Sequence, residues 1–349
     1  MLPSGTVMDK TGNNCEHCYR VMFGLHHTHT DGHSSVRMCG HFITLLNDVI
    51  EGNSINDEIQ LAEFVSNEHM NKILADAKEV LKADSKLHNE YRRMFEAQAK
   101  LEPLFFKLFP PENDDNPKTL SISKDFSETI TQQFFSKAKS EGITVHSAFC
   151  SIFHAAFVEL LNASDSCQEE YELLSAHDMN YRRYWNIDGE NSFGVHIGIH
   201  KTSVVAKKNF MGEFWQNAKK FHDKLHAEIK KKHAIMMGVI EDELKPGVIT
   251  EESFYSNKTP AKTYYSVSNM GEITRLFKRP DGGDHSSVQA VHLRRSTSLH
   301  TYELASAYSF QTLNGMLLCG FDYNTRYVST KTAHTLLDKT IEIMNRLFE

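Results

Sequence analysis

The stretch LHHTHTDGHSS, from Leu25 to Ser35, holds four histidines and one aspartate within eleven residues. Before it, the apolar residues at positions 19, 21, 23 and 25 alternate with Arg20, Met22 and Gly24, which is the period of a β-strand. After it, apolar residues recur at helical spacing from Met38 to Val49, with Ser34 or Ser35 as a possible N-cap. The pattern predicts that the histidines lie on a strand-to-helix turn.

His27 is the residue of this turn that best suits proton transfer. It continues the alternating face of the predicted strand, so we expect its ring to point the same way as that buried face. An imidazole with an ordinary pKa of about 6.5 is a neutral base near physiological pH and can take the proton of a hydroxyl or amine. Asp31 lies near the helix N-terminus, whose dipole favours an anion, and Gly32 would permit a tight backbone turn. His26, His29 and His33 can also be polar turn residues without chemistry.

A metal site is the alternative use of these histidines, because Cys15 and Cys18 lie just upstream. The spacing is unfavourable, since neighbouring His26 and His27 on a strand project to opposite faces and cannot easily reach one ion. No H-E-x-x-H motif is present, and no second ligand pair follows at a zinc-finger interval. We therefore predict no metal ligands, with a zinc protein that uses Cys15, Cys18 and the histidines as the alternative.

The rest of the chain predicts an α/β protein divided near its first third. Helical periodicity covers residues 55–108, and FPPENDDNPK, residues 109–118, breaks it with three prolines. We predict an N-terminal subdomain over residues 1–108, a linker over 109–118 and a C-terminal subdomain over 119–349. In the last part, strands and helices alternate. The strands are expected over 119–122, 172–179, 193–200, 263–268, 299–310 and 316–323, and the helices over 127–140, 145–161, 209–231 and 330–347, with Thr144 as an N-cap.

Composition limits the partners and the compartment. The chain has 45 acidic and 38 basic residues and a net charge of −7, which gives no basis for a nucleic-acid partner. Six cysteines show no framework spacing, and no secretory signal is visible at the N-terminus, so we expect a reducing, cytoplasmic location. The most apolar stretch, residues 145–161, contains polar residues such as His146 and His154, which favour a buried core helix over a membrane span.

These motifs together resemble the chloramphenicol-acetyltransferase-like superfamily. The stretch from His26 to Gly32 matches its HHxxxDG signature, and the similarity extends from about Tyr19 to the C-terminus. The alcohol-acetyltransferase branch is the most similar one, and condensation domains belong to the same superfamily. The further segments that resemble family motifs are GITVHSAFCSIFHAAF (142–157), DMNYRRYW (178–185), FGVHIG (193–198), SNMGEI (268–273) and the terminal strand and helix from Gly320.

The resemblance implies two α/β sandwich subdomains with a substrate tunnel between them. It implies transfer of an acyl group from a CoA or carrier-protein thioester to an alcohol or amine, without a cofactor or a covalent enzyme intermediate. In this scheme His27 is the general base, supported by His26. Asp31 is a structural residue paired with Arg182, with Arg183 as the fallback. Ser268 and Asn269 would help to polarise the thioester carbonyl, or else form only a turn after a strand.

The sequence departs from the family at its beginning. Only twenty-five residues precede His26, far fewer than the family carries before this motif. We therefore expect either an N-terminally truncated gene product or a reduced first subdomain, and in both cases part of one tunnel wall would be missing. The alternative function is a non-catalytic binding protein that keeps a degenerate acyltransferase scaffold.

Overall fold

The computed structural model describes residues 17–55, 57–58, 62–112, 114–244, 265–278, 287–299 and 304–348. Contacts divide the chain into two compact units. The first comprises residues 1–65, 191–195 and 273–293, and the second comprises residues 66–190, 196–272 and 294–349.

The first unit is built around helix α1, Gly32–Ile50. The helix packs on the short 3-10 helix η3, Thr274–Phe277, and a side chain at Gly40 would overlap the backbone carbonyl of Leu276. A two-residue strand β1, Glu63–Phe64, pairs in parallel with β4, Ser192–Phe193, which comes from much later in the chain. The close approach of the Leu276 backbone therefore requires a glycine at position 40, in the middle of α1.

The strand predicted over residues 19–25 is wrong. Residues 17–26 have no regular secondary structure, and the apolar residues of the expected buried face are exposed, Tyr19 by 81% and Val21 by 53%. An alternating pattern describes a face that a sheet can bury, but a strand forms only where a neighbour supplies hydrogen bonds. Within the described residues no strand pairs with this segment.

The second unit contains a six-stranded mixed sheet in the order β2-β8-β7-β6-β3-β5. Strands β3 and β6 and strands β6 and β7 pair in parallel, and the other neighbours are antiparallel. The predicted strands are confirmed where they are described, with two differences. Residues 193–200 divide into β4 and β5, and the strand predicted over 299–310 begins only at Ser306. The strands are β2, Thr119–Asp125; β3, Glu170–Asn180; β5, Ile197–Lys207; β6, Tyr265–Glu272; β7, Ser306–Leu313; and β8, Met316–Asn324.

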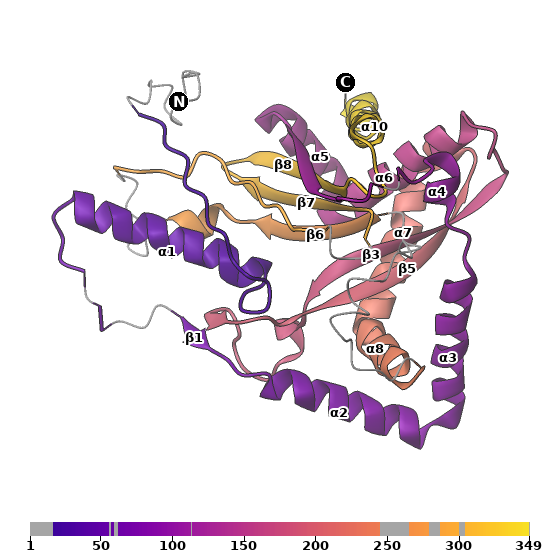
Figure 1. Cartoon of the computed structure of the whole chain (residues 1–349), viewed down its shortest axis with the longest axis horizontal. Coiled ribbons are helices and arrows are strands. Elements are labelled where there is room, and N and C mark those ends of the chain that lie inside the picture. The colour runs from indigo at the N-terminus through magenta and orange to yellow at the C-terminus, as the bar shows by residue number, and fades with distance from the viewer. Residues whose placement is uncertain are drawn as a thin grey trace. The chain divides into compact units, whose positions relative to one another are not determined.

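A layer of helices packs on this sheet and encloses the main core. Figure 1 shows α5, Glu128–Ser140, α6, Val145–Asn162, and α10, Thr330–Phe348, along strands β6 to β8. Helix α7, Phe214–Lys230, preceded by the 3-10 helix η2, Phe210–Glu213, completes the layer. The Thr144 side chain accepts a hydrogen bond from the Ser147 N–H, which confirms the predicted N-cap of α6.

Three further helices form a second core in the same unit. They are α2, Glu68–Ala83, α3, Ser85–Lys100, and α8, His233–Leu244. Of these three, only α8 was not predicted from the sequence. Helix α4, Leu104–Leu108, joins the main core through Leu104 and Phe105. The observed division therefore differs from the boundary predicted at residues 109–118, because the apolar faces of α2 to α4 are buried against elements of the second unit.

Helix α6 is also the one helix of the described chain that is long and apolar enough to cross a membrane. In the structure 72% of that stretch is buried inside the protein. A core helix of a globular protein passes the same test of length and composition, so the burial agrees with the core-helix interpretation.

The cores of the second unit also enclose histidines. Burial lowers the pKa of His146 to about 4, of His154 to about 3 and of His233 to about 4, and burial likewise places the pKa of His177 well below its ordinary value. Neighbouring imidazoles act in the same direction on His146 and His177. These four rings are therefore neutral in the folded protein at physiological pH.

The first prediction concerns the aromatic centre of the main core. Phe149 of α6 is fully buried, with its ring 4.6 Å from that of Phe310 and 4.9 Å from that of Phe153 between centroids. We expect Phe149→Ala to lower the free energy of unfolding by about 3–5 kcal/mol, because it leaves a cavity. Urea unfolding monitored by circular dichroism measures this. Lys139→Ala on an exposed position of α5 is the control, with an expected change within about 0.5 kcal/mol.

The second prediction concerns acid sensitivity. Below about pH 6.5 the unfolded chain binds a proton at each of these four histidines, whereas in the folded chain the pKa is about 4 for His146 and His233, about 3 for His154 and well below its ordinary value for His177. The contribution of these neutral histidines to the free energy of unfolding is therefore fully present above their pKa in the unfolded chain, about 6.5. It is lost as the pH falls below that value. We expect the free energy of unfolding to fall by about 1 kcal/mol per histidine between pH 7.5 and 5.5, measured by urea titration with a chelator present.

The matched variant for this test is His154→Gln. The glutamine can keep a hydrogen bond to the Tyr265 hydroxyl, which lies 3.2 Å from the His154 Nε2 atom. The variant should show a shallower pH dependence by about one proton. Equal stability of the wild-type chain at the two pH values would contradict the prediction.

Candidate active site

The HHxxxDG motif forms a turn that leads directly into α1. The His26 carbonyl accepts a hydrogen bond from the His29 N–H at 3.0 Å, and the His26 Nδ1 atom lies 2.7 Å from the Thr28 hydroxyl oxygen. These bonds hold His26 as a turn residue. The predicted turn before the helix is thus confirmed, although no strand precedes it.

Asp31 is the N-cap residue of α1. Its backbone is extended, its carboxylate accepts the Ser34 N–H at 2.9 Å and its carbonyl accepts the Ser35 hydroxyl at 2.7 Å. The predicted cap at Ser34 or Ser35 is therefore corrected to Asp31, because only its carboxylate reaches an unpaired N–H of the first turn. Gly32 is the first helical residue, and its φ is not among the positive values of the chain. The tight turn expected at Gly32 therefore involves no positive φ at this residue.

A segment distant in the sequence anchors this turn. The Gly194 carbonyl accepts hydrogen bonds from the Asp31 N–H at 3.3 Å and from the Ser34 hydroxyl at 3.0 Å, while the Gly194 N–H donates to the Ser34 oxygen at 3.2 Å. Gly194 has a φ of 141°, which strongly favours glycine. Asp31 and Ser34 are buried at 1% and 0% exposure. The motif is therefore held by a glycine about 160 residues away.

His27 differs from its prediction. Its side chain is exposed, so the expectation that it lies on a buried face is wrong. The physical reason is the missing strand, because without a sheet the alternation of residues 19–25 does not define a buried side. In the described part of the chain no hydrogen bond or ion pair orients the His27 ring.

Arg182 lies in the second unit, on the 3-10 helix η1, Tyr181–Tyr184, directly after β3. It is buried, and its N–H and Nη1 both donate to the Asn180 side-chain oxygen, at 3.0 and 3.3 Å. Its guanidinium lies 5.8 Å from the ring centroid of Trp185. Arg183 is exposed. The pairing of Arg182 with Asp31 stays a prediction.

Ser268 and Asn269 lie within β6, not in a turn after it. The Ser268 hydroxyl and carbonyl oxygens both accept hydrogen bonds from the Arg295 guanidinium, each at 3.1 Å. Arg295 is partly buried in the second unit, and desolvation lowers its pKa to about 10 although Asp178 and Asp322 act in the opposite direction. Since a hydroxyl that accepts from arginine keeps its own proton, Ser268 can still donate a hydrogen bond.

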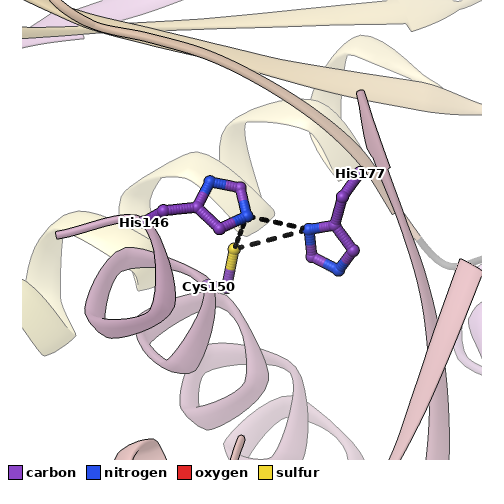
Figure 2. A group of neighbouring side chains, drawn as sticks. All are labelled: His146, Cys150 and His177. Atoms are coloured by element: carbon purple, nitrogen blue, oxygen red, sulfur yellow. Dashed lines mark hydrogen bonds between the residues drawn. The ribbon is translucent and has the colours of Figure 1, made fainter. Parts of the chain in front are cut away.

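A cluster of side chains that could bind a metal ion lies in the second unit and was not predicted from the sequence. His146 and Cys150, one turn apart on α6, meet His177 of β3 (Figure 2). Their Nε2, Sγ and Nδ1 atoms all lie within 4.8 Å of one another. The i, i+4 spacing of His146 and Cys150 was a usable signal, because it puts both on one helix face. Nothing local pointed to His177.

The chain matches no known family model and no curated protein by sequence. Its structure matches the epimerization domain from the third module of tyrocidine synthetase B, with a TM-score of 0.55, 14% identity and coverage of 92% of this chain and 66% of that one. It also matches TRI3 trichothecene 15-O-acetyltransferase from Fusarium sporotrichioides, with a TM-score of 0.57, 12% identity and coverage of 90% and 64%.

A third match is polyketide synthase associated protein 5 from Mycobacterium tuberculosis, with a TM-score of 0.55, 10% identity and coverage of 92% and 71%. The chain thus spans about two thirds of the length of these structures. At such low identity the matches describe the fold alone. The chain has the mixed α/β fold of the chloramphenicol-acetyltransferase-like condensation domains and acetyltransferases.

Proposed function

We propose that the chain is an acyltransferase that moves an acyl group from a CoA or carrier-protein thioester to an alcohol or amine. The observation that carries the proposal is the HHxxxDG turn at the N-terminus of α1 in a chain with this fold. Carrier-protein thioesters are included because condensation and epimerization domains of synthetases are among the matched structures.

His27 is the general base of the proposed reaction. It removes the proton of the acceptor O–H or N–H as the oxygen or nitrogen attacks the thioester carbonyl carbon. The tetrahedral intermediate then expels the thiolate, which takes up the proton, so no group remains on the enzyme. The ring is exposed. An acceptor can therefore reach it, and binding of that acceptor has to supply the desolvation that the turn lacks.

Asp31 and Ser268 are proposed as supporting residues. The Asp31 carboxylate fixes the start of α1 and with it the turn that carries His26 and His27. The Ser268 hydroxyl, held by Arg295, is proposed to donate to the thioester oxygen as negative charge develops there. Asn269 is proposed to help polarise the thioester carbonyl. Arg182 is proposed to pair with Asp31.

A second candidate is a binding protein that retains the fold without turnover. The observation in its favour is the His27 ring, which nothing in the described chain orients by a hydrogen bond. A catalytic base is usually held by a third group. Such a protein would bind acyl-CoA, seen as a rise in melting temperature, but would show neither transfer nor thioester cleavage across a panel of acyl donors.

The third prediction tests the base. We expect His27→Ala to lower turnover of an acyl-CoA donor with an alcohol or amine acceptor by about a hundredfold or more, because the proton has no other acceptor in place. Release of free CoA, followed with a thiol reagent, measures this. His29→Ala on the same exposed turn should keep wild-type turnover. Undiminished turnover in a folded His27→Ala chain would remove His27 from the mechanism.

The fourth prediction separates the capping role of Asp31 from its charge. Asn is as good an N-cap as Asp, so Asp31→Asn should keep the helix, whereas Asp31→Ala should destabilise the chain by about 1 kcal/mol or more. If the carboxylate also pairs with an arginine as proposed, Asp31→Asn should still lose most of its turnover. Urea unfolding and the CoA-release assay give the two readouts. Full turnover in Asp31→Asn would show that Asp31 acts only as a helix cap and that its charge is not needed.

A further inference from the structure

The donor cluster of the second unit has the geometry of a metal site. The His146 Nε2 atom lies 3.1 Å from His177 Nδ1 and 3.6 Å from Cys150 Sγ, and His177 Nδ1 lies 3.9 Å from Cys150 Sγ. A tetrahedral Zn²⁺ ion, with Zn–N of about 2.0–2.1 Å and Zn–S of about 2.3 Å, holds its nitrogens about 3.3 Å apart and a nitrogen and sulfur about 3.6 Å apart. The three observed separations differ from these values by about 0.3 Å or less.

The three donor atoms also point inward to a common position. Figure 2 shows the two rings facing each other across the thiol, with the donors coming from one helix and one strand. Cys150 is fully buried and His177 is 3% exposed, while His146 is partly exposed. The site is thus shielded by packed elements, and an ion can enter from the side of His146.

Neighbouring polar groups keep the donors in place. The Ser175 hydroxyl oxygen lies 2.9 Å from His177 Nε2, so that Nε2–H donates to it and Nδ1 presents its lone pair to the cluster. The Asn269 side-chain nitrogen lies 3.5 Å from His146 Nδ1, and the Asn269 side-chain oxygen accepts the Gly271 N–H at 2.7 Å. His177 therefore has the outer partner that metal-binding histidines commonly use, and His146 lies next to a polar amide.

We propose that His146, Cys150 and His177 bind one Zn²⁺ ion, with a fourth position open to water or a small ligand. Two imidazoles and a thiol favour zinc, since Mg²⁺ and Ca²⁺ take oxygen ligands. Three protein ligands and an open position form the pattern of zinc sites that accept an exchangeable ligand. The three proposed ligands all belong to the second unit and include none of the HHxxxDG residues, so the proposal does not depend on the proposed acyl transfer.

Binding of Zn²⁺ requires the thiolate form of Cys150. The thiol proton therefore leaves to solvent as the Zn–S bond forms.

The fifth prediction is stoichiometric metal binding by the full-length chain after treatment with a chelator. Titration with Co²⁺, a spectroscopic probe for tetrahedral zinc sites, should saturate at one equivalent and show thiolate-to-cobalt charge transfer, and Zn²⁺ should displace the cobalt. We expect Cys150→Ala to abolish the charge-transfer band and to weaken Zn²⁺ binding by more than about a hundredfold. Ser175→Ala, which leaves all three ligands in place, should weaken binding by about 10–100-fold.

Two controls make this test specific. Cys319→Ala removes another buried thiol of the same core and should bind Co²⁺ like the wild type. A chain with Cys15→Ser and Cys18→Ser tests the rival site near the N-terminus, which includes Cys15 outside the described residues, and should also bind normally. The proposal is overturned if the wild-type chain takes up no ion, if Cys150→Ala retains the band, or if only the double variant loses it.

Discussion

The burial of helix α6 is the constraint on which the second unit depends. Thirteen residues of this eighteen-residue helix are buried, among them Phe149 and Phe153 against the aromatic side chains of β6 and β7. A helix that is apolar on nearly every side has to be enclosed, so the sheet and helices α5, α7 and α10 pack around it. The same enclosure brings His146 and Cys150 to the strand that carries His177. The same packing therefore forms the core and brings the three side chains of the donor cluster together.

The first unit depends on a smaller set of interactions at Asp31. Its carboxylate caps α1, and its N–H binds the Gly194 carbonyl, so one residue joins the motif turn both to its own helix and to a segment from the second half of the chain. Ser34 repeats this link with two further hydrogen bonds to Gly194. In a buried setting each of these groups would be costly if left unpaired. The hydrogen bonds to Gly194 therefore hold the motif turn in place.

The two candidate sites place histidine in opposite environments. The His27 ring is exposed, whereas burial holds the rings of His146, His154, His177 and His233 in the second unit neutral. An exposed imidazole gains no catalytic power from its surroundings until a ligand covers it. A buried neutral imidazole already has a lone pair available for a metal, and its enclosure disfavours a proton there. The environment, more than the residue type, thus separates the proposed base from the proposed ligands.

Local patterns in the sequence determined much of this protein. They predicted α1, α5, α6 and α10, the Thr144 cap, most strands of the large sheet and the turn with His26, His27 and Asp31, because helix and strand periods and caps are properties of a short window. Tertiary structure alone decided three other features. Residues 19–25 have the pattern of a strand but lack a partner in the described chain, helices α2 to α4 joined the second unit, and His177 met His146 and Cys150. Strand pairing, the division of the core and the convergence of distant side chains depend on which surfaces meet, and a local window carries no information about that.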